Sequence, residues 1–188
     1  YSFNVDMEYS IDTWKLIYGG RYSWTNNDSD NTFLDLSLGI PIFDANRSKS
    51  FFYNENIFAI YPSLAKEISD YLSAKLGLRY ENTNASGYSP QENQRDKYKY
   101  DGFFPTAYLL YKPADNHSLS INVGRRIDRP YMSQLNPFRT IYSPYSFAQG
   151  NPKLKPSYSY NYELEYGYKD LAITTLYYKK SKSEITQV

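Results

Sequence analysis

The chain has 188 residues and no cysteine, and its 21 Lys and Arg nearly balance 20 Asp and Glu. The absence of cysteine excludes a disulfide scaffold and a thiolate metal site, and the balanced charge gives no field that would favour nucleic acid or an acidic substrate. With 23 Tyr, 10 Phe and 2 Trp, the composition is typical of strands. No apolar run approaches the roughly 18 residues of a membrane helix, and no signal-peptide pattern is present. A membrane β-barrel is not excluded, because its strands give a much weaker hydropathy signal.

Segments in which apolar and polar residues alternate predict about eight strands. In chain order they cover residues 2–10, 14–25, 55–66, 71–83, 103–112, 117–124, 158–168 and 171–180. The alternation is sharpest in 158–168, where tyrosines and one leucine occupy every second position. In 55–66 apolar residues fall on both faces, so the sequence does not assign its phase.

The predicted connections alternate between short and long. Short turns are expected at residues 11–13, 67–70, 113–116 and 169–170, and long connections at 26–54, 84–97 and 125–156, the first with a strand piece within 33–40. Outer-membrane barrels have short periplasmic turns and long extracellular loops, whereas the connections of soluble sandwiches are shorter and less regular. The pattern therefore predicts an all-β, antiparallel up-and-down meander that is part of a large transmembrane β-barrel.

The longest uninterrupted connection, residues 125–156, is divided at regular intervals by prolines. They are Pro130, Pro137, Pro144, Pro152 and Pro156. Because proline lacks a backbone N–H and fixes its own φ, the segment is expected to be neither a helix nor a central strand. It is predicted to be a long ordered loop, and ordered loops of this length tend to be functional.

Four arginines in this loop are the candidate ligand-binding residues: Arg125, Arg126, Arg129 and Arg139. Their guanidinium groups could hold an anionic ligand in bidentate fashion. Alternatively, they bond loop carbonyls and nearby carboxylates and so order a backbone that is broken by prolines.

Other chemistry-bearing residues are sparse. The single histidine, His117, is expected to be a solvated turn residue, and without cysteine most catalytic triads and zinc sites cannot be built. Glu163 and Glu165 share one strand face and could support glycoside hydrolysis, but polar lining of a barrel lumen is favoured. Asp28 and Asp30 lack the spacing of a calcium loop and are expected in a hydrated loop. We therefore expect no catalytic residue, no metal, no cofactor and no enzyme activity.

Several motifs occur in a specific order along the chain. RIDRP at 126–130, LNPF at 135–138 and GNPKLKP at 150–156 precede NYELEYGYK. Upstream lie ENIFAIYPSLAKEI, LGLRYENT and FFPTAYLLYK. This series resembles the barrel of TonB-dependent receptors of the outer-membrane β-barrel family, over nearly all of the chain and most weakly from 33 to 52.

The resemblance implies a barrel of about 22 strands around an N-terminal plug, located in the outer membrane of Gram-negative bacteria. It implies import of a nutrient such as a metal chelate or glycan, with energy transduced by TonB. The expected partners are outer-membrane lipid, TonB through the plug, and the small-molecule or oligomeric ligand, but no nucleic acid. Ligand contacts vary among the loops and plugs of the family, so no family site residue is carried over.

Residues 1–188 are expected to be an internal fragment of such a barrel. They contain no plug pattern or TonB-contact segment, and they end at Gln187 and Val188 without the terminal aromatic strand of a complete barrel. Alone, such a fragment would expose its lipid-facing rows and two edge strands, so we expect it to need detergent or to self-associate.

Two other hypotheses are a self-contained carbohydrate-binding β module or small barrel, for which eight strands suffice, and an extracytoplasmic glycosidase.

Overall fold

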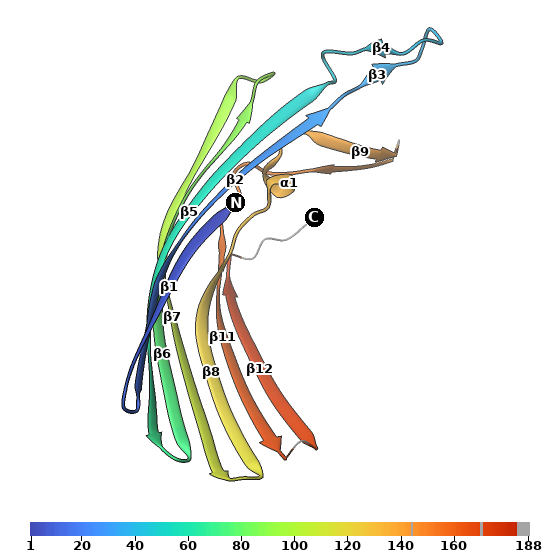
Figure 1. The fold of residues 1–188 in the computed structure, drawn as a ribbon. Coiled ribbons are helices and arrows are strands. Elements are labelled where there is room, and N and C mark those ends of the chain that lie inside the picture. Colours follow the sequence, from blue (N-terminus) through green and yellow to red (C-terminus); the bar gives the residue numbers. More distant parts are fainter. Residues whose placement is uncertain (144, 170, 184–188) are drawn as a thin grey trace.

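A computed structural model describes residues 1–143, 145–169 and 171–183. Its main feature is one eight-stranded antiparallel sheet with the order β1-β2-β5-β6-β7-β8-β11-β12. These strands are β1 (Ser2–Ile11), β2 (Trp14–Asn31), β5 (Lys49–Ser69), β6 (Leu72–Ser89), β7 (Gln94–Ala114), β8 (His117–Asp128), β11 (Ser157–Tyr168) and β12 (Ala172–Lys182). The predicted all-β meander is confirmed. Sequential strands are neighbours throughout the sheet, which is strongly curved (Figure 1).

The smaller elements belong to two connections. The β2–β5 connection holds β3 (Leu34–Asp35) and β4 (Ile42–Phe43), so the strand piece predicted within 33–40 is present but short. The β8–β11 connection holds α1 (Met132–Leu135), β9 (Arg139–Ser143) and β10 (Ser146–Gln149). No helix in the described part of the chain is long and apolar enough to cross a membrane.

Cross-strand register gives the sheet one apolar face. Tyr22 lies opposite Phe58, and Leu16 opposite Leu64. This pairing assigns the phase of β5 that its sequence left open, because directly opposed residues share a face. The same register continues across the sheet, for example from Leu109 to Ile121 and from Ile121 to Leu164. We call this surface the outer face; the opposite, inner face is mostly polar.

Aromatic residues mark both edges of the apolar band on the outer face. Near one edge the Tyr80 and Phe103 ring centroids are 5.1 Å apart, and those of Tyr162 and Tyr178 are 5.9 Å apart. Near the other edge Tyr71 meets Tyr111 edge to face at 6.0 Å. Between the edges, the exposed residues of the face are predominantly aliphatic and aromatic.

Four strands continue beyond the band. The predictions that residues 26–54 and 84–97 are loops are therefore wrong in part, because strands extend into both segments. The strands β2, β5, β6 and β7 contain 18, 21, 18 and 21 residues. Residues 84–97 are therefore a continuous hairpin with a turn at 90–93, and the 26–54 connection shrinks to residues 32–48. Residues 26–31 and 84–97 are mostly polar, which suggested loops, but backbone pairing does not require apolar side chains. On the outer face of β7, Phe103 within the band is followed by Asp101, Lys99 and Lys97 beyond it. This change is expected where a strand extends out of an apolar band.

The short turns lie where the sequence placed them, although the strands run further into them. Asp12 adopts a positive φ of 49° in the β1–β2 turn, and Asp115 with Asn116 forms the β7–β8 turn. The predicted turn at 169–170 includes Asp170, which lies outside the described residues, while Lys169 has a φ of 48°.

The prediction that residues 125–156 form a loop without helix or strand is wrong in part. Residues 125–128 belong to β8, and α1 and the β9–β10 hairpin lie within the remainder. Pro130 precedes α1 and Pro137 follows its C-cap residue Asn136, so these prolines flank the helix rather than interrupt it. Pro144 lies outside the described residues. We call residues 129–156 the inner loop, because they lie on the concave side of the sheet (Figure 1).

Candidate functional site

The β7 and β8 strands separate at one end, and Arg125 lies at this separation. Their ladder ends at Thr106 opposite Gly124. Beyond it, the Arg125 Nη1 donates to the Phe103 carbonyl at 3.0 Å, and its guanidinium lies 5.6 Å from the Phe104 ring and 4.8 Å from the Tyr158 ring. The Phe104 and Tyr158 rings are themselves stacked, at 12°. Arg125 therefore links β7 to β11 at the end where β7 and β8 separate.

Arg129 joins the inner loop to the sheet through Glu81. Glu81 is 7% exposed, and its carboxylate pairs with Arg129 and, at 2.5 Å, with Arg79 Nε. Arg129 also donates to the Thr83 hydroxyl at 3.2 Å and lies over the Tyr100 ring. Buried charges require such partners, because removal from water is costly. This network fixes the start of the inner loop.

The other two arginines have different surroundings. Arg139 Nε donates to Gln149 Oε1 at 3.4 Å, and its guanidinium lies 4.4 Å from the Phe147 ring, all within the β9–β10 hairpin. Arg126 faces a small polar recess of about 140 Å³ that Glu163 also lines. Within the described part of the chain it has neither an ion pair nor a side-chain hydrogen bond. The structure thus brings Arg125, Arg126 and Arg129 together around one recess of about 440 Å³, but not Arg139.

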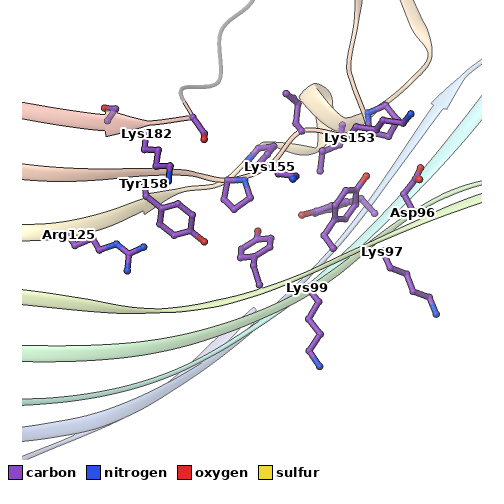
Figure 2. A pocket seen from close by; sticks show the side chains of 18 of the residues that line it. Asp96, Lys97, Lys99, Arg125, Lys153, Lys155, Tyr158 and Lys182 are labelled. Carbon is purple, nitrogen blue, oxygen red and sulfur yellow. The ribbon is translucent and has the colours of Figure 1, made fainter.

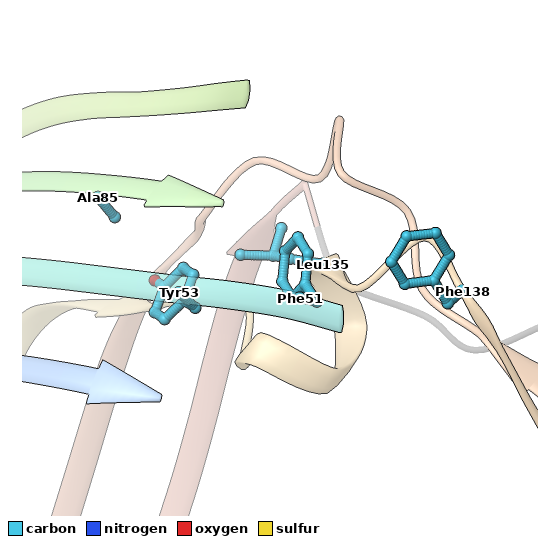
Figure 3. Packing of buried hydrophobic residues seen from close by; sticks show 5 residues of the cluster. All are labelled: Phe51, Tyr53, Ala85, Leu135 and Phe138. Atoms are coloured by element: carbon cyan, nitrogen blue, oxygen red, sulfur yellow. The ribbon is translucent and has the colours of Figure 1, made fainter. Parts of the chain in front are cut away.

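A hydrophobic cluster holds the middle of the inner loop against the sheet. Leu135 of α1 and the following Phe138 pack with Phe51, Tyr53 and Ala85 (Figure 3). Both loop residues are buried, at 2% and 8% exposure. The contact needs a glycine on β6: a Cβ on Gly87 would lie 2.7 Å from Phe51 Cζ. Most of the buried apolar side chains among the described residues belong to this cluster.

Two Asn-Pro segments of the inner loop adopt the same local structure and contact each other. The Asn136 side chain accepts from the Phe138 N–H at 3.0 Å, and the Asn151 side chain accepts from the Lys153 N–H at 2.9 Å. Such turns are a preferred use of Asn. Between the segments, the Gly150 N–H donates to the Asn136 carbonyl at 2.8 Å, and a Cβ on Gly150 would lie 2.5 Å from the Gln134 carbonyl. The LNPF and GNPKLKP motifs therefore form one folded unit.

Below this unit lies a cavity of about 1060 Å³. One wall is the inner face of the β7 extension. The other is formed by side chains that continue the outer-face rows of β11 and β12 at the ends of these strands next to the inner loop, where β8 has separated from β7. Residues 152–156 cover the cavity (Figure 2). Its tyrosines come from both walls: Tyr53, Tyr98, Tyr100, Tyr158, Tyr160 and Tyr162. Its volume lies at the upper end of the range of small-molecule sites.

Two residues that line this cavity carry polar atoms without protein partners. The Tyr98 hydroxyl and the Arg125 Nε are buried without a hydrogen bond to any described residue. Burial raises the pKa of Tyr98 and of Tyr100 to about 12. Both hydroxyls therefore stay protonated at neutral pH and can donate hydrogen bonds.

The remaining sequence candidates lie elsewhere. His117 Nδ1 and the Tyr166 hydroxyl are 2.8 Å apart, so this histidine has a specific partner at its turn. Glu163 is on the inner face, where it lines the small recess with Arg126. Asp28 and Asp30 were expected in a loop, but they lie within β2, paired opposite Phe52 and Ser50.

Sequence reasoning missed most residues of the large cavity. Tyr98 and Tyr100 lie between the predicted loop 84–97 and the predicted strand 103–112. Glu81, which lines the smaller recess, lies in the predicted strand 71–83 and was not among the candidate residues. Alternation of Tyr98 and Tyr100 with Lys97, Lys99 and Asp101 is a strand signal that could have identified the extension.

Comparison with known proteins decides the family. The family model described as "Outer membrane protein beta-barrel family" matches residues 1–188. The chain belongs to this family. No curated protein matches it by sequence. The outer face is accordingly the lipid-facing surface of a protein of the bacterial outer membrane, and its aromatic edges are interfacial girdles. Because outer-membrane barrels have short periplasmic turns and longer extracellular loops, we expect the strand extensions and the inner loop on the extracellular side.

Two solved structures share the fold. The ferric yersiniabactin uptake receptor FyuA from Yersinia pestis matches with a TM-score of 0.62 and 16% identity, over 96% of this chain and 28% of that chain. The ferric citrate transporter FecA in its unliganded form matches with a TM-score of 0.60 and 14% identity, over 91% of this chain and 25% of that chain. The chain thus spans little more than a quarter of these proteins.

Proposed function

We propose that the chain is part of the barrel wall and extracellular loops of a TonB-dependent importer that takes up a nutrient ligand. The wall itself performs no catalysis. Residues 1–188 contribute a sector of one larger barrel domain, and the plug, TonB contact and remaining strands belong to the rest of that protein.

The observation that carries this proposal is the inner loop folded against the inner face of a lipid-facing sheet. A loop anchored by Glu81, Arg129 and Leu135 leaves a large cavity open beneath it, above the apolar band. A purely structural wall has no need of such a cavity. Uptake receptors require a ligand site on the extracellular side, and the fold likeness to FyuA and FecA agrees with this reading.

The open sheet favours a larger barrel over a self-contained carbohydrate-binding module. Within the described residues, β1 and β12 form the two edges of the sheet and do not pair with each other. Their unpaired N–H and C=O groups would be a liability in a separate module. In a larger barrel, neighbouring strands satisfy both edges.

Electrical recording from the full-length protein in planar lipid bilayers tests the proposal without knowledge of the ligand. With a plug in place, the protein should conduct little, because the plug fills the lumen. Removal of the plug-coding region should produce a large pore, since barrels of this size enclose a wide lumen. A full-length protein without a separable plug, or one that forms no pore after its removal, would contradict the importer function.

A further inference from the structure

We propose that the cavity between β7 and β11 binds a carboxylated ligand that contains rings. The proposal rests on the importer function above and names the chemical class of its ligand. The class includes acidic sugars and aromatic acids, which share negative charge and ring faces.

The charge of the cavity selects an anion. Seven Lys or Arg residues and one carboxylate, Asp96, are among the described residues that line it. The side chains of Lys97 and Lys99 extend to the opposite side of the sheet, which leaves five cationic side chains for the cavity (Figure 2). Lys153 and Lys155 come from the covering segment of the inner loop, and Lys182 comes from the end of β12 (Figure 2). Lys182 lies opposite Tyr158 in the register and therefore on the same face. The low dielectric of a partly enclosed cleft strengthens attraction to a negative ligand.

The aromatic walls select rings. Tyr98 and Tyr100 lie on the β7 wall and Tyr158 and Tyr160 on the β11 wall, so a ligand between them meets tyrosines on both sides. Tyrosine offers a flat apolar face with a hydroxyl at its edge, which suits sugar and aromatic rings. An aliphatic anion would leave these faces unused.

The unpartnered polar atoms fit the same ligand. Arg125 is held by the Phe103 carbonyl and by the Phe104 and Tyr158 rings, yet its Nε remains unpaired. A carboxylate can accept from this donor in a charge-assisted hydrogen bond. The Tyr98 hydroxyl, also buried and unpaired, supplies a second donor. A buried donor without a partner costs free energy, which a bound acceptor would remove.

Calorimetric titration of the full-length protein in detergent with three probes tests this inference. Trigalacturonate represents an acidic sugar, 2,3-dihydroxybenzoate an aromatic acid, and maltotriose a neutral sugar of similar length. We expect at least one acid to bind and maltotriose to bind at least tenfold more weakly; whichever acid binds identifies the source of the rings. Affinity for that acid should fall as salt is raised.

Two pairs of substitutions with the same charge change locate the site. Lys153→Gln with Lys155→Gln should weaken binding of the acid about fivefold to tenfold, because both lysines lie over the cavity. Lys97→Gln with Lys99→Gln is the control, because these side chains extend to the opposite side of the sheet (Figure 2). The control should change affinity less than twofold. Tyr98→Phe, which removes only a hydroxyl, should weaken binding about threefold to tenfold.

The outcomes separate this inference from the importer function. If neither acid binds, or if maltotriose binds equally well, the ligand class is wrong. If the two lysine pairs weaken binding equally, the cavity is not the binding site. If a plug-dependent pore is found in the same preparation, the importer function stands in each of these cases. Heat-modifiable migration on a gel verifies that each variant retains a folded barrel.

Discussion

At the scale of single residues, Glu81 shows how one side chain connects the loop to the wall. Its carboxylate is almost fully buried between Arg79 of its own strand and Arg129 of the inner loop. The sequence predicted two alternative uses of the loop arginines, ligand contact or ordering of the backbone. The contacts of Arg125, Arg129 and Arg139 with protein groups show the ordering use, while a ligand role for the four arginines remains a prediction.

Substitution Glu81→Gln should release the start of the inner loop. It removes both ion pairs but keeps the side-chain shape, and disruption of a buried pair costs roughly 3 kcal/mol. Backbone amides from 129 to 138 should exchange hydrogen about 100-fold faster, as measured by mass spectrometry of the full-length protein. Glu8→Gln is the control: the Lys15–Glu8 pair is about half exposed, and loss of an exposed pair has little effect. Equal protection in both variants would contradict the anchoring role.

At the scale of elements, strand length and loop packing depend on each other. The extensions of β5 and β6 are mostly polar on their outer face, apart from the stacked Phe52 and Tyr88. On the inner face, Phe51 and Tyr53 are covered by α1 and Phe138. Gly87 leaves the space that Phe51 fills. The extension thus provides a surface for the loop, and the loop buries the apolar residues that a solvated extension would expose.

Leu135→Ala should therefore detach α1 and loosen the β6–β7 hairpin. Truncation of a fully buried leucine costs about 2–5 kcal/mol, which exceeds what the remaining contacts of a four-residue helix can offset. Limited proteolysis of intact cells should cleave the inner loop at least tenfold faster. Leu34→Ala in β3 is the matched control, since Leu34 is 49% exposed. Cleavage at unchanged rates in the Leu135 variant would show that the cluster does not hold the loop.

At the scale of the whole molecule, the lipid-facing band sets the orientation of everything else. Strands of about 9–11 residues suffice to cross the hydrocarbon core, so the 18 to 21 residues of β2, β5, β6 and β7 place their ends outside the membrane. The inner loop and its cavity lie at these ends, and the short turns lie at the other.

Labelling with a membrane-impermeant maleimide should confirm this orientation. These 188 residues contain no cysteine. A single introduced cysteine is therefore the one site that the maleimide can label, once any cysteine elsewhere in the protein has been replaced. Asp101→Cys, on the outer face of the β7 extension, should react on intact cells. Asp115→Cys, in the β7–β8 turn, should react only after the outer membrane is permeabilised. The reverse pattern would invert the assignment of both ends.

The sequence by itself determined the fold class, the strand positions within the membrane and the short turns. Alternation such as that of Trp14 to Trp24 or Leu164 to Tyr168 arises because one face meets lipid and the other a polar lumen, and this signal is local. The motif series also identified the family, whose model matches the whole chain.

Only the tertiary structure decided the strand extensions, the phase of β5 and the candidate site. The extension of β6 is polar because it stands outside the membrane, so its pairing leaves no apolar pattern to read. The phase of β5 depends on its neighbours, through Tyr22 opposite Phe58. The cavity depends on the separation of β7 from β8, which brings Tyr98 and Tyr158 to facing walls although they lie far apart in the sequence. Contacts between distant segments leave no pattern in the local sequence. Exposure of one strand face to lipid, in contrast, produces an alternation of apolar and polar residues.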